Sequence, residues 1–129
     1  MLRVDHLPLL EDRLVELESS LVSLVDELKP NVCAIEELYA HYKHPRTAIV
    51  MGHARGVLLM TARRAGMKCF EYAANRVKQS LTGHGHASKT AMQAGVQAQW
   101  NLPELPEPPD VADALAVALC CLRSGDATR

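Results

Sequence analysis

The spacing of apolar residues predicts alternating helices and strands. Leucines recur every three or four residues from Leu9 to Leu28, which is the apolar stripe of an amphipathic helix. Lys29-Pro30 ends this helix, because proline disfavours the helical conformation of the residue before it. The apolar run from Val32 to Ile35 predicts a buried strand that ends in Glu36-Glu37. The leucine stripe also fits a short coiled coil, although packing against a sheet is favoured.

The same alternation continues to the C-terminus. The further predicted elements are a helix over Pro45–Ala65, a strand over Met67–Tyr72, and helices over Ala74–Leu81, Ser88–Trp100 and the segment PPDVADALAVALCC. Gly66 stops the first of these helices, and Ser88 is the expected N-cap of the helix that it begins. Strands that alternate with helices indicate an α/β domain, here with a thin sheet.

Small residues form a face of the helix predicted over Pro45–Ala65. Ala48, Gly52 and Gly56 recur every four residues. Each glycine inside a helix costs about 1 kcal/mol relative to alanine. A smooth face of this kind permits close packing against another helix or another subunit.

Composition and charge narrow the class of protein. The 129 residues are 48% hydrophobic, which is enough for the core of one domain spanning residues 1–129. No apolar run approaches the ~20 residues of a membrane helix, and the N-terminus lacks the order of a signal peptide, so we expect a cytoplasmic protein. Residues 38–100 carry nine Lys and Arg and a single acid, Glu71, within a chain of net charge -1. This basic segment is either a polyanion-binding face or an ordinary solvated surface.

Three acidic residues occupy positions that suit a metal site. Asp110 and Asp113 share one face at the start of the last helix, where Asp110 could act as an N-cap. That helix is otherwise apolar all round, so a carboxylate on it needs a partner, and a cation is one candidate. Glu36 stands at the C-terminal end of a strand, where α/β sheets place ligands. Together with the basic segment, these acids suggest Mg²⁺ ligation beside a phosphodiester.

The cysteines and histidines give only weak evidence for disulfides or a zinc site. The four cysteines include no Cys-x-x-Cys pair, so buried thiols are favoured over zinc ligands or disulfides. His41-x-x-His44 and His84-x-His86 leave a zinc site open as an alternative, but no cysteine or acid stands near them at ligand spacing.

Three segments resemble the RuvC family of Holliday-junction resolvases. They are AIEELYAHYKHPRTAIVMGHARGV, FEYAANRVKQSLTGHGHASK and PPDVADALAVAL, and the resemblance extends from Leu9 to Leu119. It implies an α/β RNase H-like fold, with a mixed sheet flanked by helices, and a homodimer. It further implies Mg²⁺-dependent incision of four-way DNA junctions with two ions, and a branch-migration helicase complex as partner.

The resemblance also implies roles for individual residues. The catalytic and metal-binding residues would be Glu36, Asp110 and Asp113. The DNA-binding residues would be Tyr39, which is placed for stacking near the junction centre, and Lys78 and Lys89. Without the resemblance, Tyr39 is simply a loop tyrosine and each lysine a solvated charge. The helix over Pro45–Ala65 would form the dimer interface.

The N-terminus departs from the family pattern. The family begins with three strands, the first of which ends in a Gly-Ile-Asp-Pro-Gly-like motif that supplies a central metal-binding aspartate. Asp5 has no Pro-Gly turn after it and does not match. We therefore expect a chain that is incomplete at the N-terminus and cuts little or not at all by itself, with residues 123–129 as a flexible tail. A form that binds junction DNA or dimerises without cutting is the alternative function.

Overall fold

The computed structural model describes residues 7–38 and 43–128, which divide between two compact units. The first unit comprises residues 1–33 and 38–69, and the second comprises residues 34–37 and 70–129. Both units belong to the stretch 1–129 that the sequence assigns to one domain. Within the described ranges, no helix combines the length and the apolar character that crossing a membrane requires.

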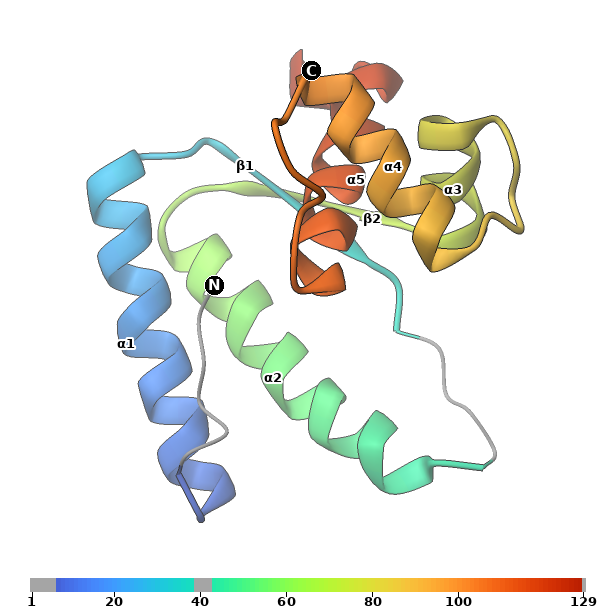
Figure 1. The fold of residues 1–129 in the computed structure, drawn as a ribbon. Coiled ribbons are helices and arrows are strands. Elements are labelled where there is room, and N and C mark those ends of the chain that lie inside the picture. The colour runs from blue at the N-terminus through green and yellow to red at the C-terminus, as the bar shows by residue number, and fades with distance from the viewer. Residues whose placement is uncertain (1–6, 39–42, 129) are drawn as a thin grey trace. The chain divides into compact units, whose positions relative to one another are not determined.

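The order of the elements follows the order that the sequence predicts (Figure 1). They are α1 (Leu10–Leu28), β1 (Val32–Glu36), α2 (Pro45–Arg64), β2 (Lys68–Tyr72), α3 (Ala74–Thr82), α4 (Lys89–Trp100), α5 (Pro109–Ser124) and the 3₁₀ helix η1 (Asp126–Thr128). The predicted helices and strands are therefore confirmed, with ends that differ by at most three residues.

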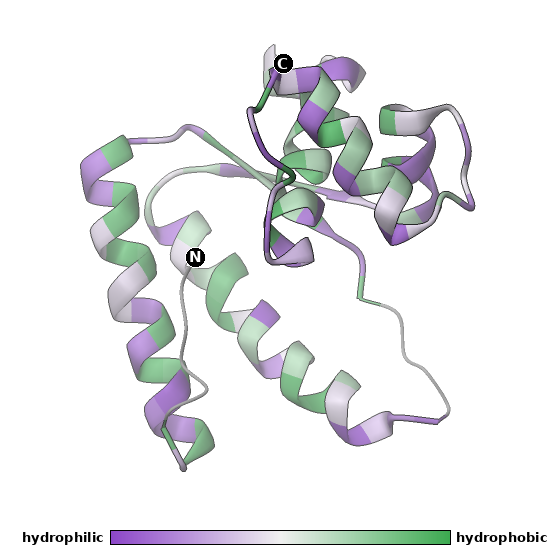
Figure 2. Ribbon diagram, in the orientation of Figure 1, coloured by the Kyte–Doolittle hydropathy of each residue, from purple (hydrophilic) through white to green (hydrophobic). Residues whose placement is uncertain are grey.

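In the first unit, α1 packs against α2. Hydrophobic and hydrophilic residues alternate along α1 (Figure 2). Its leucines are half-buried from Leu10 to Leu21, whereas Leu24 and Leu28 are exposed, and no residue of the helix is fully buried. Leu14 and Leu17 line a small cavity of about 30 Å³ together with Val50 and Ala54 of α2. The stripe therefore packs against a helix of its own chain, and the expectation that it packs against a sheet is wrong for the residues described.

The two strands form a parallel sheet joined through α2. At one end the Lys68 N–H donates to the Asn31 carbonyl at 3.2 Å, and at the other the Glu37 N–H donates to the Tyr72 carbonyl at 2.9 Å. Both bonds give the same register, in which a residue of β1 lies opposite the residue 36 positions later on β2 (68 − 32 = 72 − 36 = 36). Glu36 therefore lies opposite Tyr72. The described residues form these two strands only, which is the thin sheet that the sequence predicts.

In the second unit, α3 and α4 pack around α5. The buried residues of α5 are Ala112, Ala116, Val117, Leu119, Cys120 and Cys121. Val77 of α3 and Val96 of α4 are buried with them, at 3% and 0% exposure. The expectation that this apolar helix is buried nearly all round is wrong, because Ala114, Ala118 and Leu122 form an exposed face. The sequence predicts buried thiols. Cys120 and Cys121 are buried, whereas Cys33 and Cys69 are only half-buried.

The residues predicted as a tail, 123–129, contain several ordered contacts. The Arg123 guanidinium donates to the Ser80 carbonyl and, at 2.9 Å, to Gln99 Oε1, so it joins α5 to α3 and α4. The Tyr72 hydroxyl, on a residue 1% exposed, donates to Asp126 Oδ2 of η1 at 2.7 Å. Burial raises the pKa of this hydroxyl, so it donates as a neutral phenol.

Candidate metal and phosphate site

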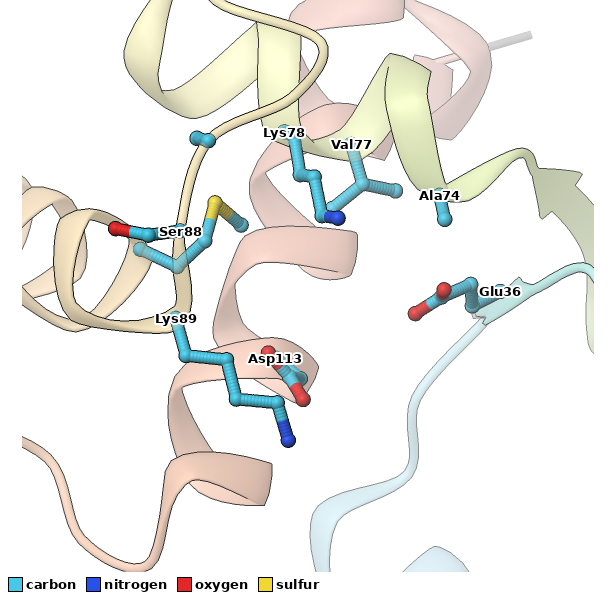
Figure 3. A pocket seen from close by; sticks show the side chains of 9 residues that line it. Glu36, Ala74, Val77, Lys78, Ser88, Lys89 and Asp113 are labelled. Atoms are coloured by element: carbon cyan, nitrogen blue, oxygen red, sulfur yellow. The ribbon is translucent and has the colours of Figure 1, made fainter.

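Four elements of the second unit place charged side chains around one cavity of about 390 Å³. Glu36 ends β1, Lys78 lies on α3, Lys89 begins α4, and Asp113 lies on α5. Figure 3 shows these side chains pointing into the cavity from their separate elements. The remaining lining residues are Ala74, Val77, Ala87, Ser88 and Met92. The cavity thus has two acids and two bases on a partly apolar wall.

Local sequence explains how Glu36 and Lys89 reach the cavity. Glu36 is the last residue of a parallel strand, at the end of the sheet where α/β proteins place ligands. Ser88 accepts a hydrogen bond from the Ala91 N–H at 3.1 Å, which confirms the predicted N-cap. Lys89 follows this cap directly, so the start of α4 fixes its position at the cavity.

The start of α5 does not match the prediction that Asp110 is the N-cap of this helix. The helix begins at Pro109, its N-cap residue is Pro108, and no side chain caps it. Proline at the first position of a helix lacks an N–H that would need a cap, so the helix starts earlier than an aspartate cap would place it. The interpretation of Asp110 as the N-cap is therefore wrong. Asp110 is exposed in the first turn, and it is absent from the residues that line the cavity.

The two acids of the cavity influence each other electrostatically. The pKa of Glu36 is raised, first by partial burial of its carboxyl and then by the negative charge of Asp113, while the Lys78 ammonium opposes the shift. Two carboxylates that repel each other in one cavity are stabilised by a cation between them. A cation bound between the two carboxylates would relieve the part of this repulsion that Lys78 does not already offset.

Glu36 and Asp113 suit a hard divalent cation. Mg²⁺ binds through oxygen, commonly through one or two carboxylates, and keeps several of its waters. Across the described ranges, no three His, Cys, Asp or Glu side chains gather closely enough to hold a metal ion by themselves. The donor set in the cavity thus fits a partly hydrated ion, with water or substrate completing the coordination.

Several sequence expectations concern other positions. Tyr39, Asp5 and the zinc alternative's His41 lie outside the described residues. In the loop between α3 and α4, the His84 N–H donates to Thr82 Oγ1 at 3.2 Å, so this amide is used within the loop.

Sequence reasoning missed Arg123, which holds three helices together. The available signal was a basic side chain in the last turn of a helix.

A strand-end glutamate, a helix aspartate and two lysines line one cavity, where oxygen ligands and basic side chains suit a metal ion beside a phosphate. The sequence profile of the family described as crossover junction endodeoxyribonuclease RuvC matches residues 1–121. The chain belongs to the RuvC family, whose nucleases are metal-dependent.

Individual relatives agree with this membership. The chain is 45% identical over 118 residues to the crossover junction endodeoxyribonuclease RuvC of Rhodopirellula baltica, covering 92% of this chain and 65% of the relative. It is 46% identical over 109 residues to the protein of that name from Ruminiclostridium cellulolyticum, covering 84% of this chain and 65% of the relative. The chain thus spans a little less than two thirds of the length of these relatives.

Solved structures show the same fold. The Thermus thermophilus RuvC structure matches with a TM-score of 0.82 and 31% identity, covering 97% of this chain and 76% of that one. The structure of T. thermophilus RuvC in complex with Holliday junction substrate matches with a TM-score of 0.83 and 32% identity, covering 93% and 72%. The resemblance and the α/β RNase H-like fold are confirmed.

Proposed function

We propose that this chain forms the larger part of a structure-specific endonuclease that resolves four-way Holliday junctions in DNA recombination and repair. The cavity that joins Glu36 and Asp113 to Lys78 and Lys89 supports this function most directly. Membership of the RuvC family supports it further, since a relative of similar fold is known in complex with a Holliday junction substrate.

In this proposal, Glu36, Asp110 and Asp113 hold Mg²⁺, with two ions in the complete site. A bound Mg²⁺ pair would activate water and stabilise the leaving oxygen of a phosphodiester. Glu36 and Asp113 already line one cavity. Asp110 precedes Asp113 by three residues on the same helix, so a modest change in its side chain would bring a third carboxylate toward the cation.

The two lysines would position the DNA backbone. Lys78 and Lys89 come from different helices and point into the cavity with the acids (Figure 3). A phosphate between them would have its charge neutralised while the scissile bond lies beside the carboxylates. Tyr39 would stack on a base near the junction centre, an interaction that is worth about 1 to 3 kcal/mol.

The proposed enzyme is a cytoplasmic homodimer that cooperates with a branch-migration helicase complex. In the first unit, α2 exposes Ile49 at 62%, and Gly52 and Gly56, three and seven residues later, lie on the same face of the helix. An apolar helix face with small residues suits close contact with the same helix of a second copy. A dimer would supply two sites for two opposed strands.

Junction cleavage tests the proposed function. The substrate is a four-way junction with labelled arms, and the protein carries this chain together with the remaining third of the relatives' length. We expect symmetric, Mg²⁺-dependent cuts, which Asp113→Asn abolishes while binding to the junction persists. Asp12→Asn, an exposed change on α1, serves as the matched control. Equal cleavage by the Asp113→Asn protein would exclude the assigned role of this aspartate.

Tested by itself, the 129-residue chain distinguishes cutting from binding. We expect it to prefer junction over duplex DNA with little or no cleavage, since it lacks a match to the family's N-terminal aspartate. Lys78→Ala with Lys89→Ala should weaken junction binding, whereas Lys29→Ala should not. Efficient cleavage by the chain alone would show that the fourth carboxylate is dispensable.

A further inference from the structure

Cys33 and Cys69 occupy opposed positions on the two strands. The hydrogen bonds at both ends of the sheet place each residue of β1 opposite the residue 36 positions later on β2. Because 33 + 36 = 69, the register sets Cys33 of β1 beside Cys69 of β2. Opposed residues of neighbouring strands project from the same face of a sheet. The two thiols therefore belong to one face, and both lie in the first unit.

This placement suits a covalent link. Neighbouring strands are separated by ~4.8 Å, and disulfides join residues whose α-carbons are ~4.4 to 6.8 Å apart. A bridge between Cys33 and Cys69 would therefore need little movement of the backbone. The β-carbons of opposed residues lie about one strand spacing, ~4.8 Å, apart, somewhat beyond the ~3.5 to 4.5 Å that a disulfide spans, which favours a strained and readily reduced bond over a permanent one.

Accessibility separates this pair from the other two cysteines. Cys33 and Cys69 are half-buried, so a small oxidant can reach them from solvent. Cys120 and Cys121 are 2% and 3% exposed, and they are successive residues of α5 whose side chains point in different directions. Of the four cysteines, only Cys33 and Cys69 are both accessible to an oxidant and opposite each other on neighbouring strands.

We propose that Cys33 and Cys69 form an oxidation site at which a peroxide converts two thiols into a reversible disulfide between β1 and β2. One thiolate attacks a peroxide oxygen, the O–O bond breaks, and a sulfenic acid and water result. The second thiol attacks the sulfenic sulfur, so the S–S bond forms, the S–O bond breaks and a second water leaves. The two thiols lose two electrons and the peroxide gains them. A cellular dithiol reverses the link by exchange.

The disulfide would close the chain around α2. It would tie together two strands that are otherwise connected through the 35 residues between Cys33 and Cys69 (69 − 33 − 1 = 35). Such a closure restricts the unfolded chain and raises the melting temperature. This inference is independent of the proposed function, because it rests on the register of the sheet alone.

Peptide mapping after oxidation tests the proposal. The 129-residue chain is treated with hydrogen peroxide, digested with trypsin without reduction and analysed by mass spectrometry. Cys33 falls in tryptic peptide 14–43 and Cys69 in 69–76, whereas Cys120 and Cys121 share peptide 90–123. We expect a cross-linked 14–43/69–76 pair that forms more than about tenfold faster in the native chain than in urea. A dithiol should then remove it.

Two variants serve as controls. Cys69→Ser should abolish the cross-link and the oxidation-dependent rise in melting temperature. Cys120→Ser should leave both in place, and circular dichroism shows whether this variant of a buried position folds. The proposal is overturned if the native wild-type chain yields only separately oxidised thiols or links between two chains. Equal rates of cross-linking in native and urea-unfolded protein would overturn it too.

Discussion

At the scale of single residues, Glu36 combines a proposed metal-binding role with a cost in stability. Its pKa is raised by burial and by Asp113, so the folded chain holds the Glu36 proton more tightly than the unfolded chain does. Its contribution to stability is therefore complete below the unfolded pKa of about 4.3 and is lost as the pH rises through the raised folded value. At neutral pH, the ionised carboxylate opposes folding.

Glu36→Gln should accordingly raise the melting temperature at neutral pH, because the amide keeps the shape and removes the charge. The gain should shrink as the pH falls below about 4.3, where both side chains are neutral. Thermal unfolding followed by circular dichroism at the two pH values measures the difference. Glu37→Gln, at the exposed neighbouring position, should change little. A lower melting temperature for Glu36→Gln at neutral pH would contradict this account.

The predicted positions of Glu36 at a strand end and Asp113 near a helix start rest on local signals, while their metal-binding role stays a prediction. A strand end and a helix start are visible in the sequence, and the structure brings both side chains to one cavity. The orientation of Asp110 was not accessible, because it depends on how Pro109 starts α5 and how that helix is rotated toward β1. The half-burial of Cys33 and Cys69 likewise depends on what covers the sheet, which an apolar run does not reveal.

At the scale of elements, glycines inside helices have different surroundings. A β-carbon added at Gly56 of α2 meets no atom within 4 Å. One added at Gly95 of α4 lies 3.0 Å from Leu81 Cγ of α3. The first glycine leaves open space on its helix, whereas the second allows α3 and α4 to approach closely.

Gly56→Ala should therefore raise the free energy of unfolding by about 1 kcal/mol, the difference in helix propensity. Gly95→Ala should gain less or lose stability, because the new methyl group must displace the Leu81 side chain. Urea unfolding of both variants measures the contrast. A gain at Gly95 that equals or exceeds the gain at Gly56 would be inconsistent with the tight α3–α4 contact.

Element boundaries were largely predictable because proline, glycine and serine act through local backbone geometry. Pro45 opens α2, Gly66 follows it with a φ of 80°, and Ser88 caps α4. The partner of the leucine stripe was not predictable, because an amphipathic helix shows which face it buries but not what lies against that face. Here the partner is α2.

At the scale of the whole molecule, exposed apolar side chains on α2 bear on assembly. If α2 forms a dimer interface, Ile49→Lys should weaken self-association by more than about tenfold, because it places a charge in an apolar contact. Its melting temperature at low protein concentration should stay close to wild type, since Ile49 is 62% exposed in one chain. Val15→Lys on α1, at 66% exposure, is the matched control. Analytical ultracentrifugation measures the self-association of both variants. Equal self-association of Ile49→Lys and Val15→Lys would exclude α2 as the interface.

We propose that Glu36 and Asp113 together hold a divalent metal ion. Binding of Mn²⁺, a paramagnetic substitute for Mg²⁺, can be measured on the 129-residue chain by electron paramagnetic resonance, without DNA or cleavage. We expect the wild-type chain to bind Mn²⁺, Asp113→Asn to lose more than about tenfold in affinity, and Asp12→Asn to bind unchanged. Equal Mn²⁺ affinity of the wild-type and Asp113→Asn chains would contradict it.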